Sequence, residues 1–474
     1  LAYATNTLGA ILGSLSGGFG LIPALTAPGC WRLAVWSLVA LGLAALAWNR
    51  QLIASLAPAA AGVGAALCLG ATGPTAAWRH SPIGAGRVEA SALQTPNAIR
   101  DWENRRRRMI GWEEDGRESS VGLDYDGGLA FIVNGKNDGS ARGDASTAVM
   151  SGLLGAILHP EPKRAMVIGL GTGETAGWLA AVDTIARVDV AELEPAILEV
   201  ARRSEAANHK ALANPKVHVE LGDARELLLT SSNRYDVIAS EPSNPYRAGV
   251  ASLFTREYYE AVSSRLEPQG LFLQWLQGYE VDAKTARIVC ATLASVFAHV
   301  ETWELGSGDL LLVGSREPIP HDMSRIRERA RRAPYDRALL FTWRVVDAEG
   351  IFSHFVADER LARRIAEIER ESINTDEQNL VEFGFARSVG TTNAGFSTVE
   401  LRRTARELDA HRPQLVGGTL DWDRVDDSVT ELYFDEATQV IDFGARTTER
   451  AHRVAALQAW AAGDPGRTLG EWSG

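Results

Sequence analysis

The sequence predicts an α/β chain with a Rossmann-like sheet, a small β unit ahead of that sheet, and transmembrane α-helices at the N-terminus. Three observations support this fold class. Before Arg79 the only charged residues are Arg32 and Arg50. From residue 151 onward, short apolar runs alternate with helical stretches, the pattern of a sheet covered by helices. The first of these runs leads into a glycine-rich turn at residues 169–173.

The N-terminal segment, residues 1–78, contains three apolar runs at 1–25, 33–48 and 52–71. Each has about the length that a bilayer core requires, and continuous apolarity favours spans over a buried hairpin. The sequence therefore predicts about three transmembrane helices. Because the chain opens on Leu1 inside an apolar run, we expect this segment to be a fragment of a larger multi-span region.

Basic residues predict the orientation of this segment. Arg32 would lie on the same side as the arginines after the third run, which include Arg79, Arg87 and the run 105–108. The side richer in arginine is normally cytoplasmic. The expected location is the cell membrane, multi-pass, with the lipid bilayer as a partner and the soluble domain in the cytoplasm.

Residues 79–107 are rich in Pro, Gly, Ala and Arg and are expected to form a linker. A small β unit is predicted at 108–150. Its strands are Met109–Glu113, Ser119–Tyr125 and Leu129–Asn134, the last two joined by the hairpin signal Asp126-Gly127-Gly128.

The Rossmann-like domain is predicted at 151–330, followed by a mainly helical C-terminal region at 331–474. Alternation of strands with helices indicates a parallel sheet whose ligands bind beyond the carboxyl ends of the strands. The expected strands are Ala165–Gly169, Val188–Glu192, Val217–Glu220, Asp236–Ser240 and Gly270–Trp275.

Three features at successive strand ends predict a site for a nucleoside-containing cofactor. Gly169, Gly171 and Gly173 permit a tight turn and a close backbone approach. Glu192 stands where a carboxylate can accept hydrogen bonds from ribose hydroxyls. Asp223 and Ala224 follow the third strand, where an acid beside a small residue can receive an adenine amino group.

The fourth strand ends in the polar loop Ser240–Tyr246, which faces the same crevice. Glu241 is its candidate catalytic base, and Asn244 and Tyr246 are candidate substrate-binding residues. The net charge of −12 excludes a general nucleic-acid binder. The three cysteines show no metal-ligand spacing, so neither a metal nor a disulfide is expected.

With these residues in place, the chain resembles the membrane-fused branch of the spermidine/spermine synthase family, the polyamine aminopropyltransferases. The resemblance extends from Trp112 to about Val313. Further resembling pieces are 133–136, the Leu253-Phe254-Thr255 segment and, beyond that range, Asn374-Thr375-Asp376. It implies a sheet of the class I methyltransferase type and, as in soluble synthases, a possible homodimer.

The resemblance also implies a reaction. Decarboxylated S-adenosylmethionine would donate an aminopropyl group to an amine or polyamine acceptor and leave methylthioadenosine. Glu192 would hold the ribose, Asp223 with Ala224 the adenine, and the glycine turn would back the sulfonium arm. The family's fourth-strand loop is Asp-Ser-Ser-Asp-Pro. Here Glu241 stands in place of the first Asp and Asn244 in place of the second.

These departures leave alternatives open. The family usually has Asp where this chain has Thr172, and the loss of acids weakens a cation site. S-adenosylmethionine itself is an alternative donor. A methyltransferase would use the same fold and ribose acid, and a nicotinamide dehydrogenase is compatible with the glycine pattern alone. A membrane sensor that binds a nucleoside or polyamine without turnover is the non-enzymatic alternative.

Overall fold

The computed structural model describes residues 2–49, 56–69, 80–82, 88, 90–125, 128–245, 247, 249–388 and 395–438. The chain forms two compact units. Unit 1 contains residues 1–140 together with 194–200, and unit 2 contains 141–193 and the chain from 201 onward.

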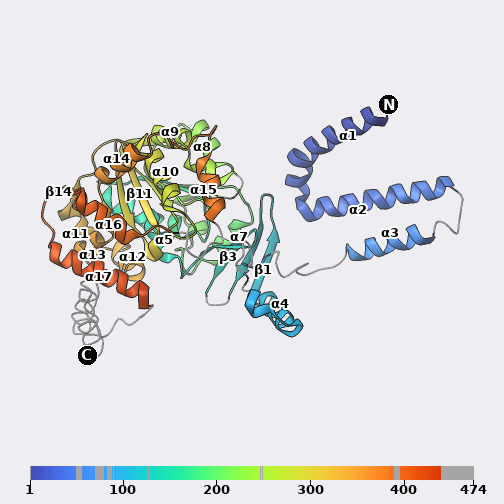
Figure 1. The fold of residues 1–474 in the computed structure, drawn as a ribbon, viewed down its shortest axis with the longest axis horizontal. Helices are drawn as coiled ribbons and strands as arrows, with labels where there is room; N and C mark the ends of the chain where they lie inside the picture. The colour runs from blue at the N-terminus through green and yellow to red at the C-terminus, as the bar shows by residue number, and fades with distance from the viewer. Residues whose placement is uncertain are drawn as a thin grey trace. The chain divides into compact units, whose positions relative to one another are not determined.

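Unit 1 begins with apolar helices, namely α1 (Ala2–Ser16), a π-helical segment (Gly17–Leu21), α2 (Ile22–Asn49) and α3 (Leu56–Cys68) (Figure 1). α2 continues through Arg32, where the sequence predicted a boundary between two spans. Arginine favours helices, so one such residue does not end α2. Within the described residues, no helix is both long and apolar enough to cross a bilayer. The three predicted spans are therefore not confirmed.

The segment 79–107, predicted as a linker, contains most of a helix that the sequence analysis did not expect. α4 spans Pro96–Met109 and follows a short 3₁₀ segment (Ala90–Leu93). Thr95 begins the helix, because its hydroxyl accepts a hydrogen bond from the amide of Ala98 at 3.1 Å. Pro96 at the first helical position needs no amide partner. The Thr95-Pro96 capping sequence favours a helix here, although the Pro- and Ala-rich composition of the segment suggested an irregular linker.

The β unit is an antiparallel sheet in the order β1-β2-β3-β4. Its strands are β1 (Ile110–Asp115), β2 (Ser120–Asp124), β3 (Ala130–Val133) and β4 (Lys136–Ser140). The first three confirm the predicted strands. β4 was missed because it is polar. The tight turn at Asn134 and Gly135, both with positive φ, pairs it with β3.

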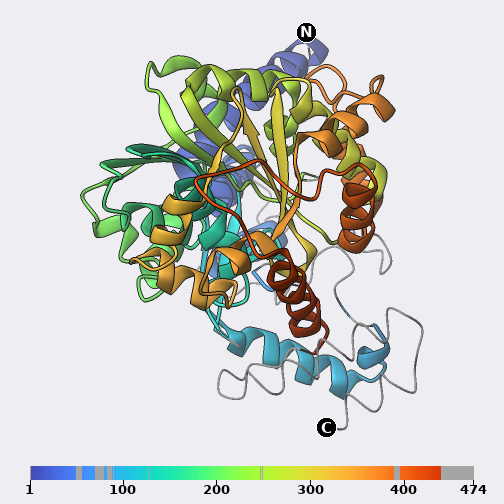
Figure 2. The same cartoon turned by 90° about the vertical axis from the view of Figure 1, so that its left-hand side faces the viewer.

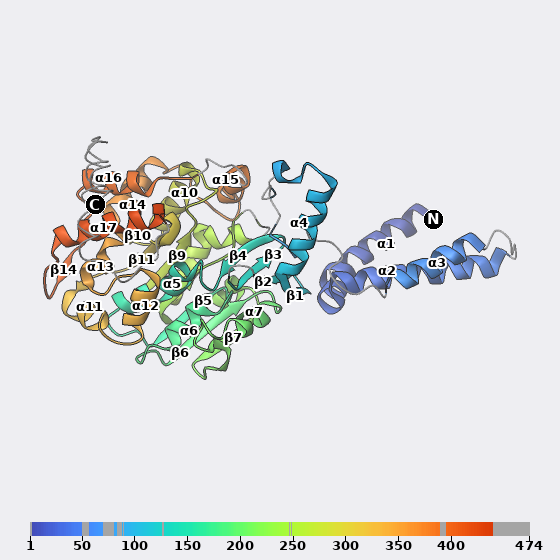
Figure 3. The same cartoon turned by 90° about the horizontal axis from the view of Figure 1, so that it is seen from below.

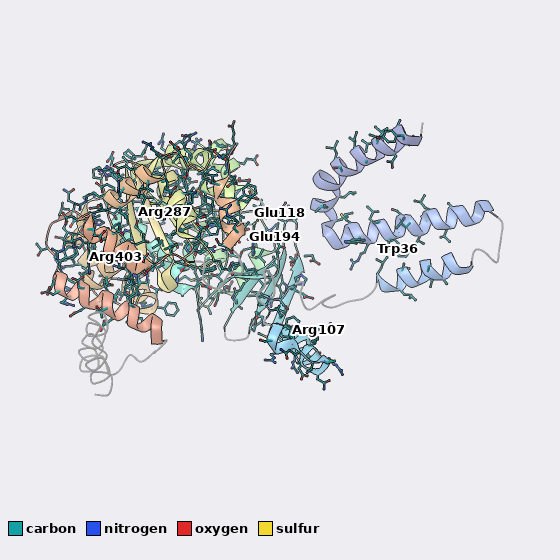
Figure 4. The ribbon with its side chains drawn as sticks, viewed as in Figure 1. Trp36, Arg107, Glu118, Glu194, Arg287 and Arg403 are labelled. Atoms are coloured by element: carbon teal, nitrogen blue, oxygen red, sulfur yellow. The ribbon has the colours of Figure 1, made fainter. Side chains whose placement is uncertain are left out.

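A buried glutamate holds the turn between β1 and β2. In Figure 4 the labels of Glu118 and Glu194 lie next to each other, and the Glu194 carboxylate accepts hydrogen bonds from the amides of Glu118 at 2.7 Å and Ser119 at 3.0 Å. A side chain on Gly116 would collide with the same carboxylate. Glu194 therefore fastens residues 194–200 to this small sheet.

Unit 2 is built on an eight-stranded sheet in the order β13-β10-β11-β9-β8-β5-β6-β7, and Figure 3 shows β5, β6 and β7 side by side. The strands are β5 (Arg164–Ile168), β6 (Arg187–Glu192), β7 (Val217–Leu221), β8 (Tyr235–Ser240), β9 (Leu266–Leu276), β10 (His299–Glu304), β11 (Leu310–Ser315) and β13 (Phe355–Ala357). The first five are parallel neighbours and confirm the five predicted strands.

The sheet is mixed, which corrects the expectation of a parallel sheet. β11 pairs antiparallel with both β9 and β10, and β13 pairs antiparallel with β10. Only residues 305–309 join β10 to β11, too few for a crossover, so these strands must form a hairpin. β13 comes from the region predicted as mainly helical, and its pairing brings that region into the main sheet.

Helices cover both sides of this sheet (Figure 2). α5 (Ala145–Leu158) is almost entirely buried and packs on β8 and β9. A buried aromatic pair, Phe272 of β9 and Phe297, has ring centroids 5.7 Å apart. It belongs to a core with α9 (Arg256–Arg265), α10 (Ala283–Ala294) and α14 (Glu359–Ile368). The remaining helices are α6 (Glu174–Ala180), α7 (Ile197–Arg203), α8 (Ala224–Thr230), α11 (Met323–Arg329), α12 (Tyr335–Thr342), α13 (Ala348–Ser353), α15 (Leu380–Ser388), α16 (Thr398–Glu407) and α17 (Trp422–Thr438).

A buried ion pair holds the C-terminal helices of unit 2 on this sheet. Glu304 at the end of β10 is fully buried, and its Oε2 accepts hydrogen bonds from Arg402 of α16 at 2.7 and 2.9 Å and from the Tyr433 hydroxyl of α17 at 3.0 Å. Removing one member of a buried pair leaves an uncompensated charge. A short parallel pair, β12 (His321–Asp322) with β14 (Leu415–Val416), joins the same region. The last part of the predicted C-terminal region, residues 439–474, lies outside the described residues.

Candidate active site

The predicted glycine turn connects β5 to α6, and its backbone explains the choice of residue. Gly169, Gly171 and Gly173 have φ values of +92°, +51° and +81°, a region that side chains rarely tolerate. A side chain on Gly169 would also lie 3.1 Å from the carbonyl oxygen of Glu241. The turn therefore passes directly against the loop that follows β8.

Asn208 supports this turn from behind, and the sequence analysis did not find it. Its fully buried amide donates to the carbonyl oxygens of Thr172 and Ala201, both at 2.7 Å, and accepts from the amide of Ala211. A side chain on Gly173 would meet the Asn208 amide at 2.9 Å. No sequence pattern links Asn208 to a turn more than thirty residues away, so only the fold shows this role.

Glu192 ends β6 next to the glycine turn, as predicted. The side chain is 8% exposed, and its Oε2 accepts a hydrogen bond from the amide of Leu170 at 2.9 Å. Its carbonyl oxygen accepts from the amide of Gly222 at 2.9 Å. The Glu192 carboxylate therefore also stabilises the glycine turn through the Leu170 amide. The spacing of residues in the sequence did not indicate this second role.

Asp223 and Ala224 open α8 after β7. Asp223 is exposed and caps the helix, because its Oδ1 accepts from the amide of Arg225 at 2.7 Å. Ala224 is buried. Arg225 also forms a two-contact ion pair with Asp376 at 2.6 and 2.8 Å, which holds the 374–376 loop near the start of α8.

The 374–376 loop has a second anchor. Asn374 is fully buried, donates to the carbonyl oxygen of Phe254 at 3.0 Å and accepts from the amide of Val381. The backbone amide of Asp376 donates to Glu257 at the start of α9. These contacts hold the 374–376 loop in place beside the start of α8.

Glu241, the candidate base, follows β8. Its Oε2 lies 2.8 Å from the hydroxyl of Thr175, which also lies 2.7 Å from the carbonyl oxygen of Ala148. Burial raises the pKa of Glu241 to about 7, against the lowering effect of the Thr175 hydrogen bond, and the charges of Asp144 and Asp309 raise it further. At neutral pH this carboxyl group therefore populates both protonation states.

Two buried acids, Glu174 and Asp309, interact electrostatically with Glu241, and the sequence analysis missed both. Burial raises the pKa of Glu174, the first residue of α6, to about 8 and that of Asp309 to about 7. Asp309 accepts hydrogen bonds from the Trp275 indole at 2.9 Å and from the amide of Gly278 at 2.7 Å. The loop after β8 therefore has more acidic groups near it than the residues of the loop alone indicate.

Asn244 lies buried in the same loop as Glu241. Its amide donates to the side chain of Gln277, which in turn donates to the carbonyl oxygen of Tyr279. An amide paired with an amide supplies no negative charge, so this position does not provide a counter-ion for an amine. Tyr246, the other candidate substrate-binding residue, lies outside the described residues.

The fold brings the candidate residues to one edge. β5 lies between β6 and β8, so the glycine turn, Glu192 and Glu241 meet at adjacent carboxyl ends, where open α/β sheets bind ligands. A cavity of about 460 Å³ lies elsewhere, near α8 and lined by residues such as Arg187, His218 and Arg265. No group of three or more metal-ligating side chains occurs in the part of the chain that the structure describes.

Comparison with known proteins is consistent with this geometry. Residues 148–303 match the family model of the spermine/spermidine synthase domain, the segment that carries the glycine turn, Glu192 and Glu241. This segment is therefore similar to a spermine/spermidine synthase domain. Among curated relatives, the chain is similar to a polyamine aminopropyltransferase of Nitrosomonas europaea, with 30% identity over 32% of this chain and 46% of the relative.

A spermidine synthase of Dictyostelium discoideum is 25% identical over 37% of this chain and 55% of its own length. The chain thus spans about half the length of the curated relatives that it matches. Among solved structures, a spermidine synthase in complex with the transition state analogue AdoDATO aligns with 19% identity and a TM-score of 0.41, covering 44% of this chain and 74% of the other. The family-model match and the curated relatives do not favour the methyltransferase or sensor alternatives.

Proposed function

We propose that the chain is a polyamine aminopropyltransferase that moves an aminopropyl group from decarboxylated S-adenosylmethionine to an amine acceptor. The observation that carries this proposal is the position of Glu241. Glu241 directly follows β8, its backbone carbonyl lies against the glycine turn, and its carboxyl, which contacts Thr175 at the start of α6, has a pKa of about 7. A base with a pKa near the working pH is suited to proton transfer.

The acceptor amine is mostly protonated at neutral pH and cannot attack in that form. The Glu241 carboxylate removes one proton from the acceptor nitrogen. The freed lone pair then forms a bond to the donor carbon next to the sulfonium, and the electrons of the breaking carbon–sulfur bond neutralise the sulfur. Methylthioadenosine leaves, and the proton stays on Glu241 until solvent accepts it.

The nucleoside part of the donor would bind along the neighbouring strand ends. Glu192 would accept hydrogen bonds from the ribose, Asp223 and Ala224 would contact the adenine, and Gly169, Gly171 and Gly173 would allow the sulfonium arm to approach the backbone. The proximity of Glu192 to the glycine turn, through the Leu170 amide, supports this arrangement.

A product assay tests the proposal. The full chain is supplied with decarboxylated or ordinary S-adenosylmethionine and a panel of amines, and methylthioadenosine and S-adenosylhomocysteine are measured. We expect methylthioadenosine with the decarboxylated donor. S-adenosylhomocysteine would instead identify a methyltransferase, and release of neither product despite nucleoside binding would leave the sensor alternative.

The location of the protein is a separate part of the proposal. We propose that the apolar N-terminal helices hold the chain at a cell membrane, with the synthase domain in the cytoplasm. Support comes from large apolar side chains that α1 and α2 expose, among them Leu12 at 58%, Trp31 at 73% and Leu38 at 69%, since such patches mark interaction surfaces. Cysteines placed after residue 80 should resist membrane-impermeant reagents in intact cells. Ready labelling from outside contradicts this orientation.

A further inference from the structure

Glu174 is a buried acid that has no part in the steps above. It follows the glycine turn directly, and its side chain is 1% exposed. Its Oε2 accepts a hydrogen bond from the Thr172 hydroxyl at 2.9 Å. Its Oε1 has no hydrogen-bond partner among the described residues. An unpaired buried carboxyl oxygen is costly, so Oε1 is suited to accept from a donor that a ligand brings.

The surroundings of Glu174 favour a cationic donor over a neutral one. The charged groups that act on it are Glu241, after β8, and Asp144, before α5, and both are acids. Burial and then these two charges raise the pKa of Glu174 to about 8, opposed by the Thr172 hydrogen bond. A neutral donor would satisfy Oε1 alone, whereas a cation would also offset the repulsion between the carboxylates.

The loop after β8 does not supply this counter-charge. Asn244 has an uncharged amide, which donates to Gln277. Glu241 is therefore the only acid in the sequence of the loop 240–246. Glu174 belongs to a different segment, the start of α6, and its charge interacts with that of Glu241. Thr172, which stands where a carboxylate is usual in the resembled family, holds Glu174 through its hydroxyl.

We propose that Glu174 binds a primary ammonium group of the substrate and that its carboxyl group releases a proton to solvent when this group arrives. The inference rests on the proposed function, which supplies the amine. A neutral carboxyl and an alkylammonium become a carboxylate–ammonium pair and one free proton, and only the carboxyl O–H bond breaks. The ammonium belongs either to the donor's aminopropyl arm or to the acceptor.

Calorimetry on the full chain at pH 7, in two buffers of different ionisation enthalpy, separates these sources. The ligands are methylthioadenosine, decarboxylated S-adenosylmethionine, and 1,4-diaminobutane added to the methylthioadenosine complex. We expect methylthioadenosine to bind without proton release. The ligand whose ammonium contacts Glu174 should release up to about one proton per site, because most Glu174 is protonated below its pKa.

The Glu174→Gln variant should bind this ligand at least about tenfold more weakly, the expected loss of a charge-assisted hydrogen bond. It should release no proton and keep its affinity for methylthioadenosine. A change confined to decarboxylated S-adenosylmethionine identifies the donor's ammonium, and a change confined to the diamine identifies the acceptor's. Glu174→Asp retains a carboxylate and should retain part of the affinity, and Glu205→Gln, at an exposed acid, should match wild type.

Wild-type affinity and proton release in Glu174→Gln overturn this inference. If that variant still forms methylthioadenosine, the proposed function stands without it. Equal loss of methylthioadenosine binding in Glu174→Gln also overturns the inference, because the residue would then support the turn and not the ammonium. Failure of wild type to bind either nucleoside overturns the proposed function itself.

Discussion

The hydroxyl of Thr175 lies 2.8 Å from Oε2 of Glu241. The same hydroxyl lies 2.7 Å from the carbonyl oxygen of Ala148. It has one proton, so it can donate to only one of these oxygens at a time. When the hydroxyl donates to Glu241, it stabilises the carboxylate and lowers the pKa of this group. Protonation of the candidate base is thus coupled to a hydroxyl on α6.

Turnover should therefore depend on pH through Glu241. Its pKa is raised to about 7, and the deprotonated form is the base, so kcat/KM for the amine should rise as pH increases through about 7. Glu241→Gln should lower kcat roughly a hundredfold to ten-thousandfold, the usual contribution of a positioned base. Methylthioadenosine affinity should stay near wild type. Undiminished turnover would exclude Glu241 as the base.

Thr175→Val should shift this pH profile without removing activity. The hydrogen bond from Thr175 lowers the pKa of Glu241, so its loss should move the rising limb to higher pH. Valine keeps the shape of the buried side chain. Thr230→Val, at an exposed position on α8, is the matched control and should leave the profile in place. Identical profiles for all three proteins would show that Thr175 does not affect the base.

Glu192→Gln should weaken methylthioadenosine binding at least about tenfold in calorimetry, because a charge-assisted contact with the ribose contributes on the order of 1.5–3 kcal/mol. Glutamine can still accept from the Leu170 amide, so the glycine turn should keep its shape. Glu192→Ala removes both contacts and should bind more weakly still. Wild-type affinity in both variants would exclude the ribose assignment.

Asn244→Asp should tighten diamine binding and lower the stability of the ligand-free protein. The new carboxylate supplies a counter-charge for an ammonium. Without ligand, it loses the hydrogen bond that Asn244 donates to Gln277 and adds a charge near other acids. Unfolding temperatures with and without the diamine measure the two effects. The double variant Asn244→Asp with Gln277→Ala tests whether the Gln277 contact is responsible for the destabilisation.

Stability of the ligand-free protein should fall as pH rises from about 5 to about 8. The pKa of Glu174 is raised from 4.5 to about 8 in the folded chain, so between these values the folded state binds more protons than the unfolded state. The stabilisation is complete below the unfolded pKa and lost as pH rises through the folded one. Glu174→Gln should flatten this dependence in thermal unfolding, and an unchanged slope would contradict the burial of a neutral Glu174.

The sequence by itself determined the five parallel strands and the residues at their ends. Alternating apolar runs and a glycine turn are local patterns, and parallel strands necessarily gather their carboxyl ends at one edge. Gly169, Glu192 and Glu241 were therefore predictable. β4, α4 and the antiparallel strands β10 and β11 were not, because they depend on turn and cap geometry or on a hairpin inserted beside β9.

Only the tertiary structure decided what surrounds Glu241. Glu174 and Thr175 come from the start of α6, whereas Asn208 and Asp309 come from two other segments, and none of the four belongs to a motif that indicates its role. Their effect arises from burial and distance. A carboxyl is raised to a pKa of about 7 because the fold removes it from water and places other acids near it, and no local pattern of residues encodes that solvent exclusion.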